Sequence, residues 1–133
     1  MSKGENIIAR LLNGANVEFE REKTFTDLRA GRYRFDFYCP NVNGAPAIIE
    51  LNGAQHYQQI GKFHKTVAEF HKGQEHDRRK ISYCLANKIK IYCIPYWDLE
   101  QLKRADDLFR DRYLARNRWH NDEVWALHKF HQR

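Results

Sequence analysis

Apolar and polar residues alternate along the chain in blocks that predict helices and strands. Residues 4–13 carry apolar side chains at helical spacing, and Asn13-Gly14 is a typical helix stop. Residues 17–25 alternate between apolar and charged side chains, which predicts a strand. By these criteria the expected elements are a helix at Gly4–Asn13, a strand at Val17–Phe25, a hairpin within 32–52, a helix or ordered flap at Lys62–Lys72, a helix at Gln74–Asn87, a strand at Ile89–Pro95, a helix from Leu99 to about Arg116 with Asp98 as N-cap, and a last helix at Asn121–Phe130.

This order of elements predicts an α/β (α+β) fold. A hairpin followed by a long helix and a further strand favours a central mixed sheet of about four strands, with helices on both faces. We expect residues 1–133 to form a single domain, with its core at about 4–102 and a basic helical extension at about 103–133.

The hairpin places two acidic residues in a notable position. A three-residue loop, Val42–Gly44, would pair Asn41 with Ala45 and put Asp36 directly opposite Glu50 on one face of the sheet. A two-residue Asn43-Gly44 loop would instead put the two carboxylates on opposite faces.

The three-residue register also gathers apolar side chains on one face, which favours a hairpin with one apolar and one polar face. These side chains are Tyr33, Phe35, Phe37, Ile49 and Leu51.

Like charges directly opposite on a sheet destabilise it, so a positive group is expected between Asp36 and Glu50. A divalent metal ion is the candidate, because hard cations bind carboxylate oxygens. We expect Mg²⁺, with Mn²⁺ as an alternative, because a zinc site would call for more His or Cys ligands.

Three further side chains are candidates for chemistry. Asp77 heads the apolar stripe of the helix at 74–87, where burying an unpaired carboxylate costs free energy. It is therefore either a site residue or the partner of Lys80 or an arginine in an ion pair at the helix start. Glu5 heads an apolar stripe in the same way, either as a site residue or as a first-turn acid that the helix dipole favours. His56 follows the strand that carries Glu50, where it is either a site histidine or an ordinary loop residue.

These residues occur in an order that resembles the PD-(D/E)XK nuclease superfamily. The resemblance is stronger to its very-short-patch-repair (Vsr)-like branch, which includes the phage EDxHD homing endonucleases. It runs from about Gly4 to Leu102. It is carried by Phe35-Asp36-Phe37, Ile49-Glu50-Leu51-Asn52-Gly53-Ala54-Gln55-His56-Tyr57, Asp77-Arg78-Arg79-Lys80, Tyr83-Cys84 and Ile94-Pro95-Tyr96.

The resemblance implies a restriction-endonuclease-like fold and hydrolysis of DNA phosphodiester bonds, by nicking or by cutting both strands. It implies that Glu5, Asp36, His56 and Asp77 take the E, D, H and D roles, with His76 as the alternative histidine. Gln55 would lie beside the scissile phosphate.

One departure concerns position 52. The general superfamily pattern is Glu-x-Lys, but here Asn52 stands two residues after Glu50. His56 or Lys80 could replace the missing lysine in space. If neither side chain does so, the chain would be a catalytically weak or inactive DNA-binding module on the same scaffold. A ribonuclease is a further alternative.

The net charge of +6 supports an anionic partner, although a solvated basic surface is the simpler reading. Residues 1–60 are balanced, so the excess lies in residues 61–133. The predicted DNA contacts are Arg78, Arg79, Lys103, Arg110, Arg112 and Arg116.

No apolar run approaches the ~20 residues that span a bilayer, and the first residues lack the apolar run of a secretory signal. The three isolated cysteines indicate neither a disulfide framework nor a zinc ribbon. We therefore expect a cytoplasmic protein that does not enter membranes, and the sequence leaves monomer and homodimer open.

Overall fold

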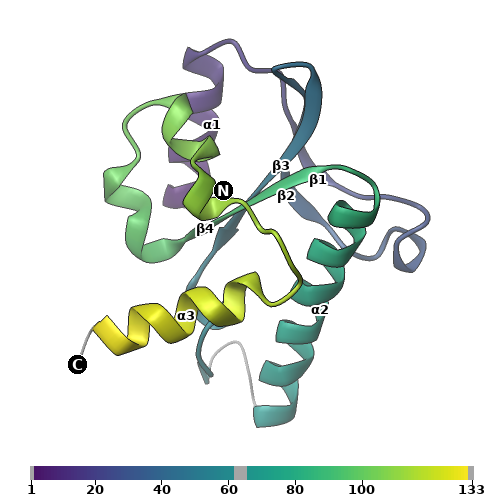
Figure 1. Ribbon diagram of the computed structural model, residues 1–133, viewed down its shortest axis with the longest axis vertical. Coiled ribbons are helices and arrows are strands. Elements are labelled where there is room, and N and C mark those ends of the chain that lie inside the picture. The colour runs from purple at the N-terminus through teal and green to yellow at the C-terminus, as the bar shows by residue number, and fades with distance from the viewer. Residues whose placement is uncertain (1, 62–65, 132–133) are drawn as a thin grey trace.

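A mixed four-stranded sheet forms the centre of the protein (Figure 1). The computed structural model describes residues 2–61 and 66–131. The strands lie in chain order, with β1 and β2 antiparallel, β2 and β3 antiparallel, and β3 and β4 parallel. Their bounds are β1 Glu20–Lys23, β2 Phe35–Val42, β3 Ala45–Asn52 and β4 Lys90–Pro95.

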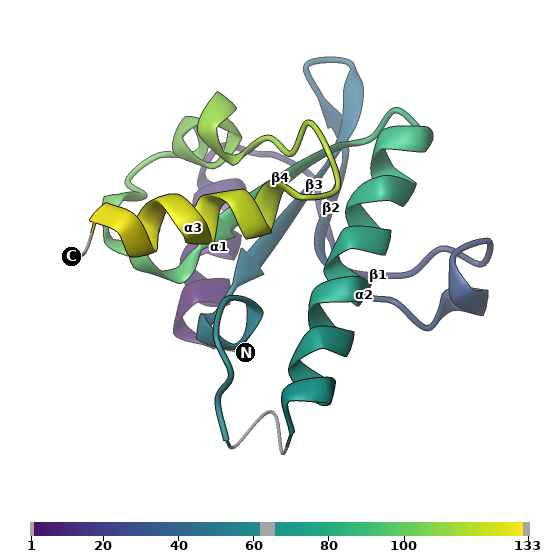
Figure 2. The ribbon, with the colours of Figure 1, turned by 60° about the horizontal axis from the view of Figure 1, so that its bottom comes forward.

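Helices cover both faces of this sheet, which confirms the expected α+β architecture. Helix α1 (Lys3–Gly14) packs on one face, and α2 (Val67–Ala86) packs on the other (Figures 1 and 2). A third helix, α3 (His120–His131), closes the described chain. Short 3-10 turns complete the structure at Arg29–Gly31, Ala54–His56, Tyr96–Gln101, Ala105–Phe109 and Asp111–Tyr113.

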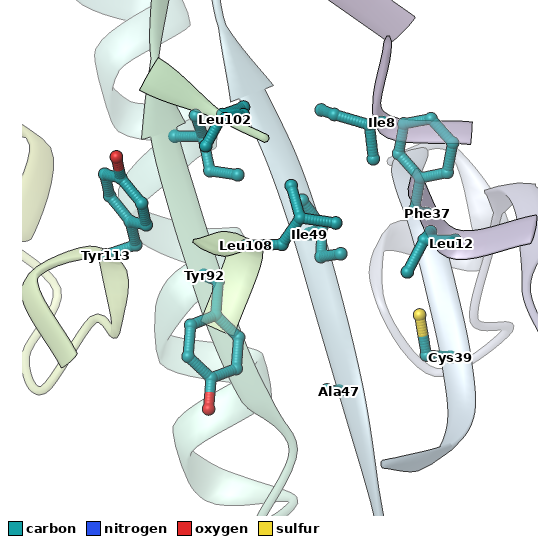
Figure 3. Packing of buried hydrophobic residues seen from close by; sticks show 11 residues of the cluster. Ile8, Leu12, Phe37, Cys39, Ala47, Ile49, Tyr92, Leu102, Leu108 and Tyr113 are labelled. Carbon is teal, nitrogen blue, oxygen red and sulfur yellow. The ribbon is translucent and has the colours of Figure 1, made fainter. Parts of the chain in front are cut away.

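The core has two parts, one on each face of the sheet. Ile8 and Leu12 of α1 pack against Phe37, Ile49 and further side chains of the first part, as Figure 3 shows. On the other face the α2 side chains pack against the sheet in a second cluster, which consists of Phe35, Ile48, Ile81, Cys84, Ile89, Ile91, Cys93 and Ala115. The expectation of one polar hairpin face is therefore wrong, because a sheet covered by helices on both sides buries apolar residues on both.

The hairpin turn differs from the predicted three-residue loop. Val42 pairs with Ala45, so the loop is Asn43-Gly44, and both residues have positive φ, of 54° and 91°. This is the geometry of the tight turns that favour Asn-Gly. A register shift between Cys39 and Val42 then restores the pairing of Phe37 with Ile49. The predicted alignment of Asp36 with Glu50 is thus reached by a different turn.

The predicted helix from Leu99 to Arg116 is wrong. The segment forms 3-10 turns instead, and Asp98 lies within the first of them rather than at a helix N-cap. Leu108 and Tyr113 are both buried in the first core cluster. Residues five positions apart point to different sides of an α-helix, so a regular helix would not bury both in one core.

Two other boundaries differ from the prediction. Thr66 caps α2, so residues 67–72 belong to the same helix as residues 74–86, and residues 62–65 lie outside the described chain. Strand β1 is shorter than residues 17–25 and contains Glu22 with a positive φ of 53°, which interrupts regular strand geometry. Within the described residues, no helix is long and apolar enough to cross a membrane.

Candidate active site

Asp36 and Glu50 meet across β2 and β3, as the register predicts. The Asp36 N–H donates to Glu50 Oε2 at 3.1 Å, and Asp36 Oδ2 accepts from the Leu51 N–H at 2.8 Å. Each carboxylate is therefore fixed by the backbone of the opposite strand. Burial, followed by the charge of Glu50, raises the pKa of Asp36 to about 8.

Lys80 of α2 provides a positive charge at this pair. Its Nζ forms an ion pair with Glu50 Oε1, and both side chains are largely buried, at 15% and 9% exposure. Burial lowers the pKa of Lys80, but the charge of Glu50 and its hydrogen bond outweigh burial, so the pKa is raised. The reading that paired Asp77 with Lys80 is not what the structure shows, because Lys80 contacts Glu50.

His56 and Asp77 form a second pair. His56 Nδ1 lies 2.7 Å from Asp77 Oδ2, with side-chain exposures of 25% and 14%. Burial lowers the pKa of His56, but the hydrogen bond and charge of Asp77 raise it above its ordinary value. Asp77 lies in the middle of α2 rather than at a helix start, so its partner is His56 and not the helix dipole.

Glu5 reaches the site indirectly, through Arg21, which is not among the predicted site residues. Its carboxylate forms an ion pair with Arg21 of β1, and Arg21 Nε donates to the Asp36 carbonyl at 3.1 Å. The Arg21 guanidinium also stacks over the Phe37 ring at 4.4 Å. Glu5 thus holds an arginine against the strand that carries Asp36, and the pairing of Arg21 with Phe37 across β1 and β2 was not predicted.

A pocket of about 370 Å³ opens beside these pairs, and we call it the site pocket. His56, Asp77 and Lys80 line it, whereas Asp36 and Glu50 do not, so Lys80 connects the carboxylates with the pocket. Its remaining lining residues are Arg32, Tyr33, Arg34, Gln55, Gly73 and His76.

The other predicted site residues lie at the edges of this arrangement. Gln55 lines the site pocket, as does His76, whose ring packs against Tyr33 at 4.9 Å rather than against a carboxylate. Asn52 is only 2% exposed and lies beside the Tyr57 hydroxyl, outside the pocket lining. Of the two histidines, His56 therefore has the geometry of a site residue.

Asp36 and Glu50 are the predicted ligands of a magnesium ion. Asp36 and Glu50 offer carboxylate oxygens, and Mg²⁺ commonly binds through one or two carboxylates together with waters and substrate phosphates. The described residues contain no group of three or more His, Cys, Asp or Glu placed for a metal ion. A cation at these oxygens would compete with the Lys80 ammonium for Glu50.

Most of the predicted DNA contacts already have partners within the chain. Arg78 forms an ion pair with Asp122 at 2.9 Å and so connects α2 with α3. Arg79 pairs with Glu75, Arg110 with Asp107, and Arg112 lies 3.9 Å from Asp98. Lys103 and Arg116 are exposed, and their side chains have no ion pair with the described residues.

Comparisons with known proteins do not place the chain in a family. No protein-family profile matches it, and no solved structure matches it. A segment of 61 residues is 40% identical to Uncharacterized protein 307L of Invertebrate iridescent virus 6. The aligned segment covers 46% of this chain and 29% of that viral protein.

Proposed function

We propose that this protein is a magnesium-dependent endonuclease that hydrolyses phosphodiester bonds in DNA. The observation that carries the proposal is the convergence of two pairs. Lys80, which contacts Glu50 beside Asp36, lines the same pocket as the His56–Asp77 pair, although these residues come from different elements. The resemblance to the Vsr-like nucleases supports the same reaction.

Asp36 and Glu50 would hold the metal ion in this proposal. When bound, Mg²⁺ lowers the pKa of a coordinated water and polarises the scissile phosphate. A cation near Asp36 also favours its ionised form, which burial and Glu50 otherwise disfavour.

His56 would move the proton. The hydrogen bond to Asp77 places the ring proton on Nδ1 and leaves Nε2 as the acceptor, so neutral His56 can take a proton from the attacking water. Lys80 would offset negative charge that develops on the phosphate. It also places beside Glu50 the positive charge of a lysine, which Asn52 does not supply.

Plasmid cleavage with Mg²⁺ tests the proposal. We expect wild-type protein to nick or linearise the plasmid and Asp36→Asn to lose most of that activity, because the amide carries no charge for a cation. Asp106→Asn is the matched control, since Asp106 is 88% exposed and lies outside the site. Equal cleavage by the wild type and Asp36→Asn would refute the assignment.

A second candidate function is DNA binding without cleavage. The Lys80–Glu50 ion pair favours it, because this pair neutralises Glu50 without a metal, and Asn52 replaces the lysine of the general nuclease pattern. Calorimetry with Mg²⁺ separates the two candidates. A nuclease binds the ion through Asp36 and loses that affinity in Asp36→Asn, whereas a binding module has no need for the ion.

A further inference from the structure

Two arginines on one wall of the site pocket have no partner in the described chain. Arg32 and Arg34 are exposed and line the pocket, and neither side chain forms an ion pair or hydrogen bond with the described residues. They differ in this respect from Arg78, Arg79, Arg110 and Arg112. Unpaired guanidinium groups are available to an anionic ligand.

Tyr33 anchors the segment that presents these arginines. It is 8% exposed, its ring lies 4.9 Å from the His76 ring, and its hydroxyl accepts from Arg79 at 3.4 Å. Figure 2 shows the connection between β1 and β2 running beside α2. Tyr33 is thus buried, whereas its neighbours Arg32 and Arg34 are exposed and line the pocket.

The part of α2 that lines the pocket contains a glycine that packing does not explain. Gly73 lies inside α2, where glycine costs about 1 kcal/mol relative to alanine. A Cβ at this position would meet nothing within 4 Å, so no packing neighbour in the described chain requires the glycine. What the glycine provides is space on the pocket side of the helix, which permits close approach of a ligand.

His76 completes this wall without adding charge. Burial, followed by the positive charges of Lys72 and Arg79, lowers the pKa of His76. The ring is therefore neutral near pH 7, and the unpaired positive charges that line the pocket are those of Arg32 and Arg34.

We propose that the site pocket binds the sugar–phosphate backbone of DNA, with Arg32 and Arg34 contacting phosphates and Gly73 providing room for the strand. This inference rests on the proposed function for the identity of the ligand. Arginine suits the role because its planar guanidinium binds phosphate oxygens in pairs. The surface differs from the basic residues of 61–133 that the sequence suggested.

The test is fluorescence anisotropy of a labelled DNA duplex, titrated in EDTA over a series of salt concentrations. Arg32→Gln/Arg34→Gln is compared with Lys3→Gln/Arg10→Gln, which removes the same charge from exposed side chains outside the pocket. Each phosphate contact contributes about 0.9 to the slope of log K against log salt, so the first variant should lower the slope by about 2. We expect its binding at 0.1 M salt to be at least roughly tenfold weaker, and the control to bind like wild type.

Variants at Gly73 provide a second, independent test of the inference. Gly73→Ala and Gly73→Leu should both unfold at higher temperature than wild type, because both residues favour helices over glycine. Only Gly73→Leu should weaken DNA binding, because its longer side chain enters the pocket. Unchanged binding by Gly73→Leu would overturn the role given to this position.

Three results would overturn the inference. One is a wild-type protein that does not bind the duplex, and another is an Arg32→Gln/Arg34→Gln variant that binds it as tightly as wild type does. The third is an equal loss of DNA affinity in both double variants. The binding assay contains no metal and needs no cleavage. A wild-type protein that binds through Arg32 and Arg34 but never cuts DNA would refute the nuclease proposal and leave this inference standing.

Discussion

Replacing Asp36 with Asn should make the protein more stable at alkaline pH. Asn keeps a side-chain oxygen that can accept from the Leu51 N–H, which donates to Asp36 at 2.8 Å. It removes a carboxyl group that is buried beside Glu50. The substitution therefore preserves local geometry and eliminates the cost of a second charge.

The magnitude follows from the pKa of Asp36. The pKa rises from 3.8 to about 8, and each pKa unit corresponds to about 1.4 kcal/mol. Ionising Asp36 at fixed geometry would thus cost about 6 kcal/mol, and because the site relaxes when the charge forms we expect about 2–4 kcal/mol.

The sign follows from proton binding. Between pH 3.8 and about 8 the folded protein holds a proton on Asp36 that the unfolded chain has released. The contribution of this group to stability is therefore fully present below pH 3.8 and is lost as the pH rises through about 8. Asp36→Asn lacks this loss, so its advantage over wild type should grow with pH.

Urea unfolding in EDTA at several pH values from 5 to 9, followed by circular dichroism, measures the effect. The difference in free energy of unfolding between Asp36→Asn and wild type cancels the contributions of other titrating groups. We expect this difference to reach about 2–4 kcal/mol at pH 8. A difference that stays constant from pH 5 to 9 would show that Asp36 does not carry a raised pKa, and the argument would fail.

Two further predictions concern the His56–Asp77 pair and the core. Asp77→Asn should lower the pKa of His56, which NMR titration measures, and an unchanged titration would contradict the pairing. The raised pKa of His56 stabilises the fold below pH 6.5, and this gain is lost as the pH rises through the pKa of His56 in the folded protein. Asp77→Asn should therefore lose more stability at pH 5 than at pH 9. Leu108→Ala should cost about 2–5 kcal/mol in urea unfolding because Leu108 is fully buried, whereas Leu127→Ala, at a position 62% exposed, should change stability by less than about 0.5 kcal/mol. Similar effects of the two changes would show that the segment after Leu102 is not part of the core.

The alignment of Asp36 with Glu50 illustrates how far a local pattern reaches. Alternation along both strands places the two carboxylates on one face once the register is right. The turn was predicted incorrectly, since Asn43-Gly44 forms a two-residue loop and a register shift after Cys39 compensates for it. A bulge of this kind leaves little trace in the sequence, so the correct pairing did not depend on the correct turn.

The segment from Leu99 to Arg116 shows where a local pattern fails. The sequence predicts one helix for this segment, but Leu108 and Tyr113 reach the core through successive 3-10 turns. Asp107 accepts from the N–H groups of Lys103 and Arg104 at 2.8 and 2.9 Å, which fixes the start of one turn. Packing against the sheet overrides helix propensity here, because propensity is a weak preference.

The sequence by itself determined the strands, the principal helices and the facing carboxylates. Periodicity and strand alternation are local properties, so neighbouring residues suffice to reveal them. Only the tertiary structure decided that Lys80 contacts Glu50 and that His56 contacts Asp77. It also decided that Arg32 and Arg34 line the same pocket as these two pairs' pocket-facing members, His56, Asp77 and Lys80. These contacts join β3, α2 and the loop before β2, and they depend on how α2 packs across the sheet, which no local pattern specifies.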